Sequence, residues 1–197
     1  TNMAANECFL DSATLRENVV ALARNIGYVP RSRRAARANV SFNVSGLTET
    51  STLTLNTGVV CNGAGTGTNN IFSIPEDITV PVVDGFADFS NIEIYEGTLI
   101  TETFTYDSSL FNQRFILDNS FIDTSTIKVK VRASVNSTSS VTYQQIDNIV
   151  GVTSTTASYL LQEIEDERYE LIFGDNTIGK KLSNDNYIIV TYVTSSG

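Results

Sequence analysis

Acidic side chains gather in one short segment, in which Glu163, Glu165, Asp166, Glu167 and Glu170 follow one another closely. Neighbouring carboxylates can exchange protons with a substrate or bind a hard cation. A cation-binding loop, however, places carboxylates at alternate positions around a glycine, and this segment contains no glycine. We therefore predict that it forms the solvated end of a β-hairpin, with contact to a basic partner and a metal or catalytic site as the alternatives.

Histidine is absent from the chain. This removes the usual general base near neutral pH, every His-based triad and the commonest zinc ligand. Asp175 has no complementary base nearby, so we predict that its carboxylate bonds to the backbone two residues further on. We expect no catalytic residue, no bound metal and no cofactor, and the protein is not expected to be an enzyme.

A glycine-rich segment occupies residues 62–70. A phosphate-binding loop would be followed by a helix and would carry a lysine or an acidic partner at fixed spacing. The residues that follow, 71–75, favour a strand instead. We predict a flexible surface loop.

Arginines are concentrated near the N-terminus. Through residue 39 there are six arginines and three acidic residues, a net charge of +3, whereas the remainder carries −12. Such an acidic body would repel phosphate backbones, so we do not expect nucleic acid to be a partner. The cluster either pairs with acids of its own domain or contacts an acidic neighbouring protein, because guanidinium groups fit carboxylates well. The interface candidates are Arg31, Arg33, Arg34 and Arg37.

The clearest predicted helix covers about residues 12–26, and residues 4–10 are also predicted to be helical. The helix over 12–26 would be capped by a box formed by Thr14 and Glu17, or one turn earlier by Asp11. Apolar residues recur at helical spacing and form a single stripe. The stripe could pack against the β body or against a helix of another subunit. The interface candidates on it are Leu15, Val19, Leu22 and Ile26.

From residue 40 onward the apolar residues alternate with polar ones, a pattern typical of strands. Turn residues separate these runs at short intervals, so we predict antiparallel sheets in a sandwich-like arrangement that follows the N-terminal helical segment. The predicted domains are 1–39, a helical segment and Arg-rich connector, and 40–197, a β region with room for a division near 107–112. The predicted strands are 40–45, 52–55, 58–61, 71–74, 78–83, 90–95, 98–106, 113–117, 126–132, 140–144, 158–162, 168–173 and 187–193.

No run of residues approaches the ~20 apolar positions that a membrane helix requires, so we expect no membrane contact. We expect Cys8 and Cys61 to be free thiols, because two cysteines do not make a disulfide scaffold.

The C-terminal residues combine a Phe173-Gly174-Asp175 turn, a second glycine at Gly179, and a strand that ends in Tyr-x-x-Ser-x-Gly at 192–197. This order resembles the baseplate J-like family, the wedge proteins of contractile phage tails and related injection machines. The helix at the N-terminus and its Arg-rich connector resemble the segment that precedes the β region in large wedge proteins. We take Phe173, Gly174, Asp175 and Gly179 as the motif residues.

This resemblance implies a structural subunit of a baseplate wedge that helps wedges to assemble, to form a ring around the hub and to pass on a conformational change to the sheath. Its partners would be other wedge proteins, and the full-length protein would form a homo-oligomer, a dimer. It would reside in the tail baseplate of the virion after assembly in the host cytoplasm. The chain would be a fragment of a longer polypeptide.

Two other functions remain open. A soluble adhesion or receptor-binding β module of a tail fits the abundance of Ser, Thr and Asn, although the chain lacks tryptophan, which sugar-stacking sites favour. A hydrolase that uses two carboxylates is the third alternative.

Overall fold

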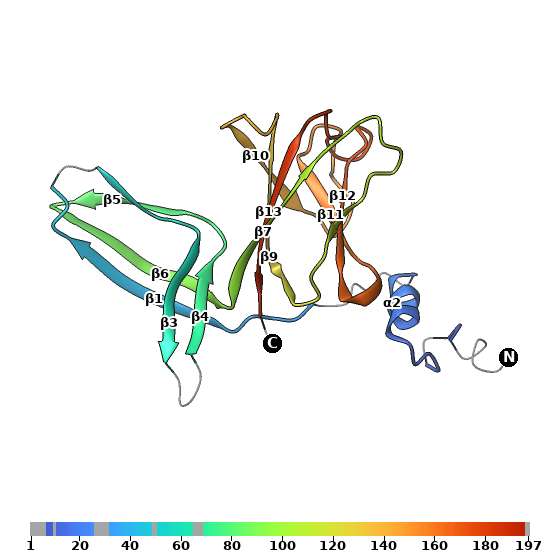
Figure 1. The fold of residues 1–197 in the computed structure, drawn as a ribbon, viewed down its shortest axis with the longest axis horizontal. Helices are drawn as coiled ribbons and strands as arrows, with labels where there is room; N and C mark the ends of the chain where they lie inside the picture. Colours follow the sequence, from blue (N-terminus) through green and yellow to red (C-terminus); the bar gives the residue numbers. More distant parts are fainter. Residues whose placement is uncertain (1–6, 10, 26–31, 49–50, 65–68, 196–197) are drawn as a thin grey trace. The chain divides into compact units, whose positions relative to one another are not determined.

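The structure is a computed structural model, and it describes residues 7–9, 11–25, 32–48, 51–64 and 69–195. These residues form a mainly β protein with a short helix near the N-terminus (Figure 1), which confirms the predicted fold class. The elements are α2 (Arg16–Asn25), β1 (Arg37–Ser45), β2 (Thr52–Leu55), β3 (Gly58–Ala64), β4 (Asn69–Ile74), β5 (Ile78–Val83), β6 (Phe86–Glu96), β7 (Thr98–Thr105), β8 (Phe115–Leu117), β9 (Ile122–Arg132), β10 (Ser140–Gln145), β11 (Ser158–Glu163), the 3-10 turn η1 (Glu165–Glu167), β12 (Tyr169–Phe173) and β13 (Tyr187–Thr194).

The chain divides into two compact units. Unit 1 comprises Thr1–Ser32, Glu102–Ser120 and Val129–Ile189, and unit 2 comprises Arg33–Thr101, Phe121–Lys128 and Val190–Gly197. The residues of β7, β9 and β13 are divided between the units. Residues 107–112, where the sequence suggests a seam, lie inside unit 1. The division into 1–39 and 40–197 stays a prediction.

Strand β6 organises the sheet of unit 2. β1 pairs antiparallel with it along most of its length, from Arg37 opposite Tyr95 to Ser45 opposite Phe86. On the other edge β5 pairs with the start of β6 and β4 pairs with its end. β2 then pairs with β5, and β3 pairs with β4. The predicted loop at 62–70 is therefore partly strand, and its residues 65–68 lie outside the described part of the chain.

A β-bulge keeps the apolar residues of β6 on one face. Ala87 and Phe89 are buried at odd positions, whereas Ile92 and Ile94 are buried at even positions. The register with β1 shifts between these pairs, and Asn91 adopts a positive φ of 55°. Its backbone N–H donates to the Ser41 hydroxyl over 2.9 Å. One extra residue in a strand reverses the alternation of faces, so the bulge lets both pairs enter the same core.

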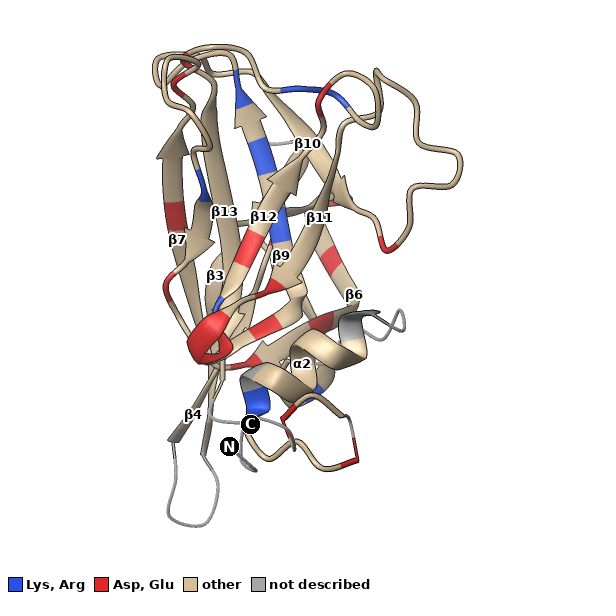
Figure 2. Ribbon diagram, turned by 90° about the vertical axis from the view of Figure 1, so that its right-hand side faces the viewer, with Lys and Arg blue, Asp and Glu red and all other residues tan. Residues whose placement is uncertain are grey.

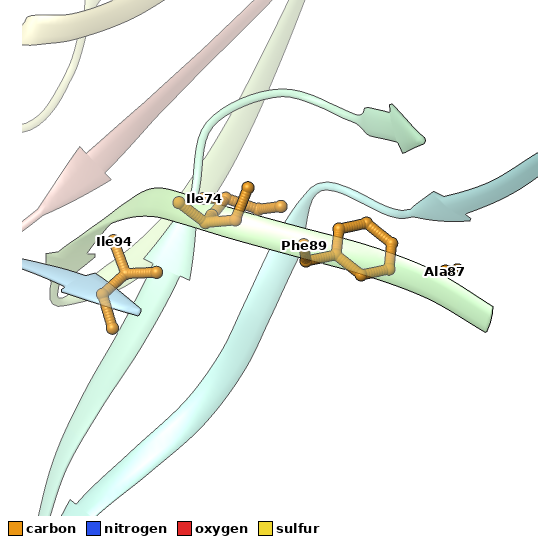
Figure 3. Packing of buried hydrophobic residues seen from close by; sticks show 5 residues of the cluster. Ile74, Ala87, Phe89 and Ile94 are labelled. Atoms are coloured by element: carbon orange, nitrogen blue, oxygen red, sulfur yellow. The ribbon is translucent and has the colours of Figure 1, made fainter. Parts of the chain in front are cut away.

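The core of unit 2 forms around these side chains and Ile74 (Figure 3). Phe89 stacks on Phe42 of β1 with ring centroids 4.9 Å apart. Half-buried residues of the neighbouring strands, among them Leu53, Leu55, Val80 and Val82, pack against the cluster. Alternation in β2 and β5 thus supplies apolar side chains to one shared face.

The second sheet has the strand order β7-β13-β9-β10-β11-β12-β8. Three of its pairs, β9–β10, β11–β12 and β12–β8, are antiparallel, whereas β10 and β11 run parallel where Gln144 lies opposite Ser158. The buried residues of unit 1 on these strands include Leu117, Val129, Tyr159, Leu171 and Ile188. The prediction of antiparallel sheets thus holds for β9–β10, β11–β12 and β12–β8 and is wrong for β10–β11.

Helix α2 begins at Arg16, four residues later than the sequence suggests. A carboxylate from an earlier turn caps it: Glu7 accepts hydrogen bonds from the backbone N–H groups of Thr14 and Leu15 over 3.0 and 3.2 Å. Glu7 also accepts from the Thr14 hydroxyl and the Asn18 amide. Glu7 thus places an anion at the helix start, where it favours the orphan N–H groups. Asp11 lies too far before Arg16 to be the cap. The box of Thr14 and Glu17 stays a prediction, because the Glu17 side chain lies outside the described part of the structure. Within the described part of the chain, no helix is both long and apolar enough to cross a membrane.

This cap gives a prediction on pH. The bonds from Asn18 and then Thr14 lower the pKa of the Glu7 carboxyl to about 2, from an ordinary value of 4.5. Because the folded pKa is depressed, the stabilisation is complete above about pH 4.5 and is lost as the pH falls through about 2. We expect the amide resonances of Thr14 and Leu15 in NMR spectra to titrate with a midpoint near 2 and to lose this titration in Glu7→Gln. A midpoint near 4.5 would contradict the capping role.

Candidate functional site

The motif turn follows β12 and begins at Phe173. The Phe173 ring lies at the centre of an aromatic cluster in unit 1. This ring meets Phe115 and Tyr143 edge to face, at centroid distances of 5.3 and 5.6 Å, and lies 6.4 Å from the tilted ring of Tyr159. Phe115 in turn contacts Phe104 at 5.7 Å. Edge-to-face pairs contribute about 0.5–1.5 kcal/mol beyond the area that they bury. Phe173 therefore links β8, β10 and β11.

The two glycines of the turn lie back to back. A Cβ at Gly174 would overlap the backbone carbon and oxygen of Gly179. Gly179 is buried and has φ = +79°, a conformation that residues with a Cβ adopt at a cost. Its N–H donates to the carbonyl of Thr153 over 3.1 Å, and the neighbouring N–H of Lys180 donates to Thr156 over 2.8 Å. The motif glycines thus bring the turn against the loop before β11.

The Asp175 side chain forms hydrogen bonds to the backbone of its own turn. One oxygen of its carboxylate accepts from the N–H groups of Thr177 and Ile178 over 2.8 and 2.9 Å. This confirms the prediction that the side chain bonds to the backbone two residues on. The bonds from Ile178 and then Thr177 hold the pKa of the Asp175 carboxyl below its ordinary value. The Asp175 carboxylate therefore bonds to the backbone of its own turn.

The acidic segment forms the hairpin end between β11 and β12, as predicted, but it is not simply solvated (Figure 2, red). Glu163 is buried, with 3% of its side chain exposed, and it accepts from the Arg16 guanidinium of α2 over 2.8 Å. Glu170 forms a bidentate pair with Arg114, with bonds of 2.8 and 2.7 Å. The sequence prediction is wrong for Glu163, because a helix from the other end of the chain covers it.

Backbone strain marks the same turn. Asp166 and Glu167 both have positive φ values, 61° and 58°. A left-handed conformation costs a residue with a Cβ about 1–2 kcal/mol. The bond from Ile164 N–H to the carbonyl of Arg168, at 2.8 Å, closes the turn, and Arg168 forms exposed ion pairs with Asp118 and Asp166.

An open pocket of about 590 Å³ lies between α2 and this turn, lined by Arg16, Arg114, Arg168, Val20, Ile116 and the acids between 163 and 167. Each of the three arginines has a carboxylate partner within 3.2 Å. The arrangement therefore neutralises the cations that a phosphate or carboxylate ligand would need. Burial, and then the charge of Glu163, raise the pKa of the Tyr169 hydroxyl to about 12. This hydroxyl is therefore protonated at neutral pH.

Because Glu163 is buried, we expect its ion pair with Arg16 to contribute more to the free energy of unfolding than the exposed ion pairs do. Arg16→Ala is expected to lower the free energy of unfolding by about 1–3 kcal/mol, because it strands a buried carboxylate, while the exposure of Arg16 limits the loss. Arg168→Ala is the matched control, since its partners Asp118 and Asp166 are 82% and 78% exposed. It should cost less than about 1 kcal/mol. Urea denaturation measures both, and equal losses would contradict this account.

The Arg-rich connector leads into β1 and is bound to unit 2. Arg37 donates to the Ser125 hydroxyl over 2.7 Å, lies 3.4 Å from the Glu93 carboxylate and stacks over the Tyr95 ring at 5.0 Å. Arg33 lies over the ring of Phe121 at 4.4 Å. Of the two alternatives left open by the sequence, these contacts favour pairing with an acid of its own domain for Arg37, whereas the contact shown for Arg33 is with an aromatic ring of the same unit. The Arg34 residue is exposed, and Arg31 lies outside the described residues.

A buried carboxylate that the sequence prediction missed anchors the connector. Asp123 is fully buried, and it accepts from the N–H of Ala35 over 2.9 Å and from the N–H and hydroxyl of Ser125. The spacing Asp-x-Ser, typical of a local side-chain turn, was the available signal. Nothing local indicated the bond to Ala35, which lies 88 positions away.

The described helical candidates are exposed or half-buried. Leu15 precedes α2 and is 49% exposed, whereas Val19 and Leu22 are half-buried. Fully buried positions are Val20 and Ala23. Ile26 lies outside the described residues. Their role as an interface stays a prediction.

Metal-binding groups of three or more His, Cys, Asp or Glu side chains are absent among the residues that the structure describes. The expectation of no metal, no cofactor and no catalytic residue stays a prediction.

Comparison with known proteins identifies a distant relative. The chain is 22% identical, over 216 aligned positions, to the baseplate wedge protein gp6 of Enterobacteria phage T4. The alignment covers all of this chain and 31% of that protein, so the chain spans less than a third of the relative's length. No family model matches the chain. This identity supports a distant relationship to phage baseplate proteins.

Proposed function

We propose that this chain is part of a structural subunit of a contractile-tail baseplate wedge, and that it acts through surface complementarity and not through an active site. The observation that carries the proposal is the alignment with a baseplate wedge protein along the whole chain. The order of Phe173, Gly174, Asp175 and Gly179, which resembles the baseplate J-like family, supports it further.

The geometry of these motif residues is consistent with a scaffold. The aromatic contacts of Phe173 and the back-to-back glycines tie three segments of unit 1 together. The arginines beside the acidic hairpin are paired with carboxylates. A subunit that transmits force through contacts needs such fixed internal geometry, because a flexible body would absorb the movement.

The finer parts of the proposal follow from the resemblance. The partners are other wedge proteins, the full-length protein forms a dimer, and wedges join in a ring around the hub. Assembly takes place in the host cytoplasm, and the protein ends in the tail baseplate of the virion.

Immunogold electron microscopy tests this function. Antibodies raised against residues 1–197 should label the baseplate end of the tail in purified particles. Particles made without the full-length protein should lack an assembled baseplate. Label confined to tail fibres, with normal baseplates in its absence, would favour the adhesion or receptor-binding module. Label on neither structure would exclude a role in the tail.

A further inference from the structure

The loop between β7 and β8 presents two adjacent apolar side chains to solvent. Leu110 is 55% exposed and Phe111 is 91% exposed. Single exposed apolar residues are ordinary on protein surfaces. Here two adjacent apolar residues are exposed on one loop. If hydrogen bonds hold the loop in that conformation, their exposure is a property of the fold and not a chance of the surface.

Hydrogen bonds within the loop fix its shape. One oxygen of the Asp107 carboxylate accepts from the Ser109 N–H over 2.9 Å and from the Ser109 hydroxyl over 2.7 Å. The Leu110 N–H donates to the carbonyl of Asp107 over 3.1 Å. Gln113 joins the two sides of the loop, because its side chain accepts from the Asp107 N–H and donates to the Thr105 carbonyl over 2.9 and 2.7 Å.

A second segment of unit 1 supports the loop from outside. The Asn184 side-chain oxygen accepts from the N–H and the hydroxyl of Ser108 over 2.9 and 3.0 Å. The N–H of Asp185 donates to the carbonyl of Tyr106 over 2.9 Å. Directly after Phe111, Asn112 adopts φ = +57°, a left-handed conformation that asparagine tolerates better than most residues with a Cβ. The polar bonds hold the loop in the conformation that exposes Leu110 and Phe111.

The base of the loop is acidic. Asp107 belongs to the loop, and Asp185 is bonded to its stem through Tyr106. The hydrogen bonds from Ser109 lower the pKa of the Asp107 carboxyl, so this group stays ionised at neutral pH. An acidic border repels the anionic surface of a membrane and attracts lysine and arginine.

We propose that Leu110 and Phe111 form an anchor that inserts into an apolar pocket, bordered by lysine or arginine, on another protein of the tail. The proposal rests on the proposed function for the location of that partner. Rigid aromatic side chains at the centre of an interface dominate binding energies, because little conformational entropy is lost when they are buried. The ordered loop provides that rigidity, and Asp107 and Asp185 provide the complementary charge.

Photo-crosslinking in the full-length protein tests the anchor. Phe111 is replaced by the photoreactive p-benzoylphenylalanine, which keeps an aromatic ring at this position, and both producing cells and purified particles are irradiated. We expect a crosslink to one tail protein, at a peptide that combines apolar residues with lysine or arginine. A crosslink to lipid, to another part of the same polypeptide, or to nothing would overturn the proposal.

A quantitative comparison completes the test. The double variant L110S/F111S should retain the circular dichroism and melting temperature of the wild type but bind the crosslinked protein at least tenfold more weakly. The control is Val150→Ser, because Val150 is 87% exposed on a different loop of unit 1. It should bind as the wild type does, and equal loss in both variants would overturn the proposal. If the crosslink forms in cells but the full-length protein that carries residue 111 is absent from tails, the proposed function fails and the anchor stands. If that protein is incorporated into tails but forms no crosslink, the anchor fails and the proposed function stands.

Discussion

Replacing Gly174 by alanine is expected to lower the free energy of unfolding of unit 1 by about 3 kcal/mol or more. The new Cβ would overlap the backbone of Gly179, and no rotamer change can relieve a clash between backbone atoms. The turn would have to open, which breaks the bonds from Gly179 to Thr153 and from Asn176 to Gly179. Chemical denaturation followed by tyrosine fluorescence measures the loss.

Gly151→Ala is the control for this variant. Gly151 lies in a loop of the same unit with φ = +81°, and a Cβ there would meet nothing within 4 Å. It should therefore cost only the about 1–2 kcal/mol of a left-handed conformation. If Gly174→Ala costs no more than Gly151→Ala, the glycine pair does not fix the turn, and its place in the motif has no packing reason.

Local patterns were sufficient for most of the strands, because alternation and turn residues act over a few positions. The strand at 78–83 was predicted with the bounds that the structure shows. The sequence around Asn91 also contains the signal for the bulge in β6, since the apolar positions change from odd to even there. We predicted a strand of uniform period at 90–95 and so missed the start of β6 at Phe86.

The pairing of buried charges could not be predicted from such patterns. Glu163 lies in an acidic run that looks solvated, yet its partner Arg16 is 147 positions away. Asp123 looks like a turn residue, yet it is buried and binds the connector. A carboxylate enters the interior only where a distant donor meets it, and that meeting depends on the complete fold. The same reason applies to Arg37, whose contacts with Glu93 and Ser125 reduce its value as an interface candidate.

The connector therefore tests the proposed wedge function most sharply at Arg34. Arg34→Glu is expected to leave the melting temperature unchanged, because exposed substitutions usually alter stability by less than about 0.5 kcal/mol. If Arg34 meets an acidic wedge protein, reversal of its charge should weaken that association by about 2–5 kcal/mol. Co-purification of the full-length variant with its wedge partners measures the association.

Arg37→Glu separates this interpretation from a purely internal role of the connector. It places a carboxylate beside Glu93 and removes both the bond to Ser125 and the stacking on Tyr95, so it should destabilise unit 2 by about 1–3 kcal/mol. The expected pattern is a folded Arg34→Glu protein that fails to assemble, next to an Arg37→Glu protein of lower stability. Normal assembly by Arg34→Glu would contradict a contact at Arg34 and would leave α2 and the Leu110–Phe111 loop as interface candidates.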